Sequence, residues 1–214
     1  TDLPKILGQL PRTVKALTIV IILGFIANGI ASPFWVIYAK NHIGLSSAQW
    51  GLVLLIESTF GNLVRIPVGF LSDRFGRTRF ILTSLILCCA SIPMFVFARS
   101  IIFVIGIRCL VAFTMASFGP SCSALLADTI PKDIRGRVLA AIGRGSVRIG
   151  AASGGTGGPG LGFLTIIPLA LASLLGGILY EWHPASPWGF VFLISTIAFL
   201  ISIFLVRDPK KAEF

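Results

Sequence analysis

The stretch GFLSDRFGRTR, from Gly69 to Arg79, places one acid and three arginines within eleven residues. It separates two long apolar runs, WGLVLLIESTFGNLVRIPV at 50–68 and FILTSLILCCASIPMFVFA at 80–98. Charges held this close to apolar sequence are typical of a short cytoplasmic connection between two membrane helices. The glycines suit a sharp turn, because glycine adopts backbone conformations that other residues avoid.

The composition is that of a membrane protein. Of the 214 residues, 55% are hydrophobic and 12% are charged, whereas soluble domains carry roughly 25% charged residues. A spanning helix needs about 20 mostly apolar residues, and six runs meet that length. The expected spans are 16–38, 48–71, 80–98, 101–127, 161–180 and 188–206. We therefore predict an all-α membrane protein with six transmembrane helices, a cytoplasmic linker at 1–15 and a cytoplasmic tail at 207–214.

The basic residues are gathered on one side of this topology. The net charge is +10, but 14 of the 18 Lys and Arg fall in the two ends and in the connections after the second and fourth spans. The opposite connections hold only Lys40 and Arg99. Cytoplasmic connections of membrane proteins are enriched in Lys and Arg, so both termini are predicted to be cytoplasmic. All four Trp and both Tyr fall near the other side, as interfacial aromatic residues do, and nothing indicates nucleic acid.

The opening stretch resembles the loop signature of the major facilitator superfamily, G-x-L-[AS]-D-R-x-G-R-[RK]. Thr78 departs from it at the last position, and Arg79 follows one place later. The matching residues are Gly69, Leu71, Ser72, Asp73, Arg74, Gly76 and Arg77. In that family this loop joins the second and third helices of a six-helix half, and its acid locks cytoplasmic helix ends together in one transport state.

Two further segments resemble the same family. Arg135-Gly136-Arg137 matches the end of its polar loop after the fourth helix, and Arg108 matches its intramembrane arginine. The resemblance implies one half of a twelve-helix transporter, and the C-terminal half is favoured because no initiator Met or signal peptide precedes the first span. It implies secondary active transport of a small solute by alternating access in the cell membrane, with a proton as the plausible coupling ion and no cofactor. The expected partners are the lipid bilayer, the substrate, and either the missing half or a second copy.

The glycine-rich segment before the fifth span allows two interpretations. Its spacing fits the antiporter signature G-x8-G-x3-G-P-x2-G at Gly145, Gly154, Gly158, Pro159 and Gly162, with Phe163 replacing the final glycine. Arg144 and Arg148 would then enter the membrane with little apolar cover, so we favour a cytoplasmic insertion. Whether residues 138–160 enter the membrane is left open. The match to G-x-G-x-x-G at 155–160 follows no strand, which argues against a dinucleotide site.

Three charged residues lie inside the spans and form the candidate substrate or proton site. Glu57 is seven residues from Trp50, and Arg108 is eight residues from Ser100. Both therefore lie roughly 10–12 Å inside the outer boundary, which makes them possible partners. Arg65 lies about 12 Å deeper on the same helix as Glu57 and is a weaker candidate partner. A static ion pair is the alternative to a binding role.

At the cytoplasmic end, Asp73 is expected to pair with Arg135 or Arg137 across the bundle. Other functional classes are less well supported. A membrane enzyme such as a phosphatidyltransferase needs clustered acids for divalent metals, whereas Asp73, Asp128 and Asp133 are scattered among arginines. The four cysteines and two histidines show no metal-site spacing, so neither an enzyme nor a metal protein is predicted. A non-transporting receptor or scaffold on the same fold, and a half-size transporter acting as a homodimer, are the remaining alternatives.

Overall fold

The computed structural model describes residues 10–142 and 163–207, and these residues form helices without strands. The all-α membrane fold predicted from the sequence is confirmed. Five of the helical segments are long and apolar enough to cross a membrane, and a sixth, Ile166–Trp182, is apolar but shorter. In chain order the elements are α2 (Arg12–Ala31), α3 (Phe34–Asn41), α4 (Ser47–Phe75), α5 (Arg77–Met94), the 3-10 turn η1 (Phe95–Phe97), α6 (Ile101–Thr129), α7 (Lys132–Ile142), α8 (Phe163–Trp182) and α9 (Ser186–Leu205).

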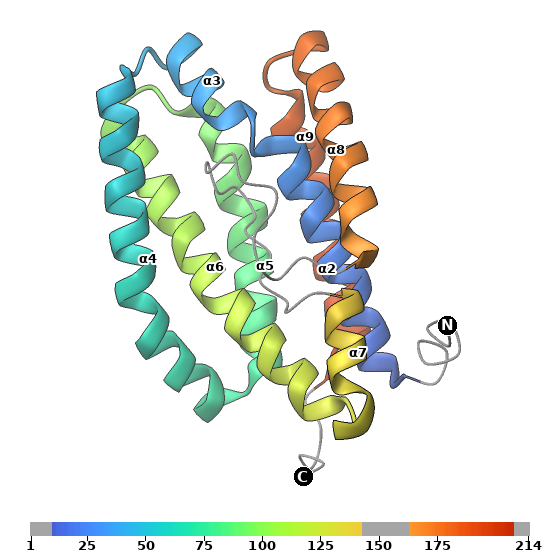
Figure 1. The fold of residues 1–214 in the computed structure, drawn as a ribbon. Coiled ribbons are helices and arrows are strands. Elements are labelled where there is room, and N and C mark those ends of the chain that lie inside the picture. The colour runs from blue at the N-terminus through green and yellow to red at the C-terminus, as the bar shows by residue number, and fades with distance from the viewer. Residues whose placement is uncertain (1–9, 143–162, 208–214) are drawn as a thin grey trace.

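The helices form a bundle in which sequence neighbours are often not spatial neighbours. Helix α6 packs against both α4 and α5, whereas α9 packs against α5 and α2, and α2 packs against α8. Helix α4 therefore stands at one edge of the bundle and α8 at the other (Figure 1). Helix α2 begins and α9 ends at the same end of the bundle (Figure 1), as an even number of crossings requires. That this end is cytoplasmic stays a prediction.

The first expected span, 16–38, is broken into two helices. Helix α2 ends at Ala31, and α3 begins after Pro33. Proline has no backbone N–H and its ring crowds the preceding turn, so a helix bends or stops there. The break lets α3 lean toward the top of α4 (Figure 1), and Trp35 and Tyr38 of α3 are buried.

The charged stretch Gly69–Arg79 is almost entirely helical, which corrects the expectation of an eleven-residue break. Helix α4 continues to Phe75 and α5 begins at Arg77, so Gly76 alone makes the turn. Its φ of 99° lies in the left-handed region that only glycine enters readily. Asp73 and Arg74 consequently project from the last turn of α4, and Arg77 projects from the first turn of α5.

Helices α2 and α8 approach each other through glycine. A Cβ added to Gly176 would lie 2.5 Å from the carbonyl oxygen of Ile30, and one added to Gly29 would lie 2.9 Å from the Cβ of Ala172. Small residues allow membrane helices to make backbone contact of this kind. The glycine-rich antiporter match at Gly145–Gly162 and the G-x-G-x-x-G match lie outside the described residues.

Candidate functional site

An ion pair joins α4 to α6 inside the bundle. Arg108 donates from Nε and Nη2 to the same oxygen of Glu57, Oε2, at 2.8 and 2.5 Å. The Arg108 side chain is 1% exposed and the Glu57 side chain 15% exposed. The structure thus pairs the two residues whose equal depth made them possible partners. An ionised side chain in this setting needs a partner, because lipid and apolar side chains give it none.

Aromatic rings enclose the Arg108 guanidinium. Its central carbon lies 4.5 Å from the centroid of Trp35 and 5.8 Å from that of Trp50, within the range of cation–π attraction. Trp35 in turn contacts Phe95 and Trp188, with centroid separations of 4.4 and 5.9 Å. Rings from α3 and α4 therefore contact the buried arginine of α6, and rings from η1 and α9 pack against Trp35.

The sequence placed these tryptophans at the membrane interface but did not show that two of them face Arg108. One available signal was the spacing of Trp50 and Glu57. Seven residues are about two helical turns, so the two side chains share a face of α4. Trp35 offered no comparable signal, because the break at Pro33 decides where α3 points.

Arg65, the third candidate, does not join this site. It is exposed on α4, and among the described residues it makes no hydrogen bond or ion pair. The weaker pairing of Arg65 with Glu57 is therefore absent from this arrangement, in which Arg108 occupies the Glu57 carboxylate. The Glu57–Arg108 pair therefore does not explain why α4 carries an arginine at position 65.

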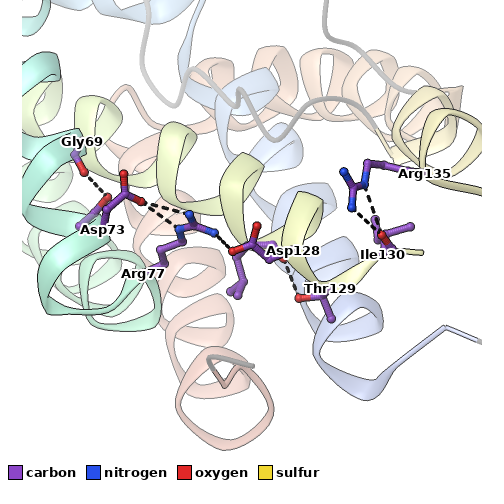
Figure 2. A network of polar contacts seen from close by, with 9 residues as sticks. Gly69, Asp73, Arg77, Asp128, Thr129, Ile130 and Arg135 are labelled. Carbon is purple, nitrogen blue, oxygen red and sulfur yellow. Dashed lines mark hydrogen bonds and ion pairs between the residues drawn. The ribbon is translucent and has the colours of Figure 1, made fainter. Parts of the chain in front are cut away.

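A second charged network lies where α4, α5 and α6 meet at the other end of the bundle. Arg77 donates from Nε to Oδ1 of Asp73 at 3.1 Å, and its Nη1 contacts Oδ2 of Asp128 (Figure 2). Asp128, which the sequence offered only as one of several scattered acids, is thus the cross-bundle partner. It lies in the last turn of α6, near enough for an arginine that starts α5 to reach it.

The expected pairing of Asp73 with Arg135 or Arg137 is wrong for this arrangement. The ion pair that Asp73 makes in the described part of the chain is with Arg77, four residues away. Arg135 instead donates from Nε and Nη2 to the carbonyl oxygen of Ile130 (Figure 2). It thereby satisfies a carbonyl that the end of α6 leaves without a helical partner. Arg137 and Arg74 are exposed, and Arg74 lies 5.7 Å from the ring centroid of Phe75.

Neither network resembles a metal centre. Across residues 10–142 and 163–207, no three His, Cys, Asp or Glu side chains come together as a possible ligand set. The acids at both sites bind arginine instead.

The model of the Major Facilitator Superfamily matches residues 17–214. The chain belongs to this superfamily. Quinolone resistance protein NorA of Staphylococcus aureus is 26% identical to it over 196 residues, which cover 90% of this chain and 44% of NorA. A Na(+), Li(+), K(+)/H(+) antiporter of Planococcus maritimus is 30% identical over 113 residues, which cover 50% of this chain and 26% of the antiporter.

A solved structure has the same fold. It is a bacterial homolog of the human lysosomal transporter Spinster in an inward-facing, unoccupied conformation, with a TM-score of 0.66 and 21% identity. The match covers 94% of this chain but 44% of that one. The chain therefore spans less than half the length of NorA and of the protein in this solved structure.

Proposed function

We propose that this chain is one six-helix half of a secondary transporter, which moves a small solute across the cell membrane by alternating access. The membership in the major facilitator superfamily and the names of an antiporter and a transporter among the similar proteins support this reading. The observation within the chain that carries the proposal is the Glu57–Arg108 pair, a buried charge pair that lies away from the ends of two helices of a membrane bundle.

Glu57 is the acid best placed to hold a proton or a cationic group within the membrane. The other acids of the described helices, Asp73, Asp128, Asp133 and Glu181, each lie in a first or last helical turn. Two hydrogen bonds from Arg108 end on Oε2 of Glu57, which ties this acid to a cation inside the bundle. Arg108 would then act as an internal cation that pairs with the Glu57 carboxylate until a proton or a substrate binds that carboxylate instead.

The Asp73–Arg77–Asp128 network is proposed as a latch between transport states. Asp73 is 64% exposed, so its bond to Arg77 contributes roughly 0–1 kcal/mol. A weak, partly solvated contact suits a helix junction that opens and closes during each cycle. The less exposed bond from Arg77 to Asp128 would hold α5 against α6 when the latch is closed.

Proton flux in proteoliposomes tests the proposal. The intact protein that contains these residues is reconstituted, a pH gradient is imposed, and solute-dependent proton movement is followed with an internal pH dye. Glu57→Gln should abolish the coupled flux, whereas Glu181→Gln, which changes an exposed acid at a helix end, should not. Solute binding without flux in the unsubstituted protein would favour a receptor on this fold instead.

The chain of 214 residues alone is expected to be inactive, because one half supplies one wall of a substrate cavity. The runner-up is a half-size transporter that works as a homodimer. Uptake by the purified chain, compared at concentrations where it is monomeric and dimeric, separates the two. Robust uptake by the monomer would contradict both.

A further inference from the structure

Helix α4 leaves most of its surface uncovered. Of its most apolar 18-residue window only 11% is buried, the lowest share among the five candidate spans. Large apolar side chains dominate the open face, and Ile66 is 81% exposed. The polar side chains of Asn62 and Arg65 are exposed on the same part of the helix.

Arg65 lies too deep in the span for a side chain without a partner. The helix is 29 residues, or about 43 Å, long, whereas the hydrocarbon core is about 30 Å thick. If the helix is centred in the bilayer, the Arg65 Cα lies about 9 Å inside the nearer hydrocarbon boundary. Charged residues at such depths almost always face protein or water rather than lipid.

We propose that the open face of α4 docks on a transmembrane helix that this chain does not supply, and that this helix presents a carboxylate opposite Arg65. A carboxylate fits because it is the side chain that completes a guanidinium with both charge and paired acceptor oxygens. The apolar residues around Arg65 would close the contact on both sides and keep water from the pair. The contact would set the position and depth of the partner helix.

A second copy of this chain cannot supply the carboxylate. In a parallel dimer the partner acid must lie at the depth of Arg65, away from the helix ends. Glu57 is the acid of the described helices that lies away from an end, and Arg108 already occupies it. The remaining acids are in terminal turns or in the end segments 1–9 and 208–214. The partner is therefore chemically different from this chain.

This proposal depends on the proposed half-transporter in one respect, namely that further helices lie beside this bundle. Its test measures association and not transport, so either proposal can fail without the other. The chain is reconstituted in phosphatidylcholine vesicles with a labelled leucine–alanine peptide of about 23 residues. The peptide carries either one glutamate or one glutamine at the depth of Arg65, and binding is read by fluorescence energy transfer.

The glutamate peptide should bind the chain about fivefold more tightly than the glutamine peptide, in line with the strength of polar contacts between membrane helices. Arg65→Gln should remove that preference. Arg99→Gln, which neutralises an exposed arginine in the connection before α6, should keep it. Arg65 is exposed and makes no hydrogen bond or ion pair among the described residues, so we expect its replacement to leave the fold intact, which circular dichroism would verify.

Two results would overturn the proposal. Equal binding of the two peptides would show that Arg65 does not select a carboxylate. Oxidative dimerisation of an Ile66→Cys variant, lost when Arg65→Gln is added, would show that a second copy covers α4.

Discussion

Arg108 of α6 gives two of its hydrogen bonds to a single oxygen of Glu57 on α4, although 51 residues separate them in sequence. The central carbon of the same guanidinium lies 4.5 Å from the ring centroid of Trp35. One side chain therefore ties together two helices that are not consecutive and the broken end of the first span. Replacing Arg108 would therefore remove packing contacts as well as a charge.

Neutralising Glu57 should destabilise the bundle. Glu57→Gln leaves the Arg108 guanidinium buried without its counter-charge, and breaking a buried pair from one side costs about 3–5 kcal/mol. We expect a clearly lower unfolding temperature in detergent, followed by circular dichroism. Glu181→Gln is the matched control, because Glu181 is exposed in the last turn of α8. An unfolding temperature equal to that of the control would mean that the pair adds nothing to stability.

Exchanging the two charges should restore the stability of the fold only in part. Glu57→Arg combined with Arg108→Glu keeps an ion pair, but it sets a carboxylate against the electron-rich face of Trp35. The double variant should therefore be less stable than the original by the lost cation–π contact, about 2 kcal/mol, while exceeding either single variant. Chemical unfolding of all four forms measures the coupling. Full recovery would show that the ring makes no energetic contribution.

The contact between α2 and α8 should not tolerate one added methyl group. Gly176→Ala places a Cβ 2.5 Å from the Ile30 carbonyl oxygen, which is backbone and cannot turn aside. We expect helix displacement and a loss of about 1–3 kcal/mol, typical of overpacking. Gly177→Ala is the control, since its added Cβ meets nothing within 4 Å and favours helix formation. If both variants unfold at the same temperature, α2 and α8 do not pack this closely.

Substitutions in the charged latch should affect the transport cycle more than stability. Asp73→Asn and Asp128→Asn each remove one partner of Arg77, and partly exposed pairs of this kind contribute roughly 1 kcal/mol or less. We expect a slower turnover with nearly unchanged substrate affinity in reconstituted intact protein. Asp133→Asn serves as the control, because Asp133 is exposed on α7. Unaltered turnover in both variants would mean that Asp73 and Asp128 contribute only to the membrane topology of the chain.

The sequence was enough to predict the class of fold and the family. Apolar runs long enough to span a bilayer have few alternatives, because the backbone of a lipid-exposed segment must satisfy its own hydrogen bonds. The loop signature around Asp73 was sufficient to identify the superfamily that the match over 17–214 confirms. Equal depth also placed Glu57 and Arg108 within reach of each other.

The tertiary structure decided which charges meet. Depth along a helix is set by counting residues, but the direction in which a side chain points depends on how each helix is rotated and tilted against its neighbours. Helix α6 turns Arg108 toward Glu57, whereas Arg65 faces outward on the same helix as Glu57. Likewise, the turn at Gly76 brings Arg77 between Asp73 and Asp128, while Arg135 closes the end of α6. Local pattern determined the helices, and packing between distant segments determined their partners.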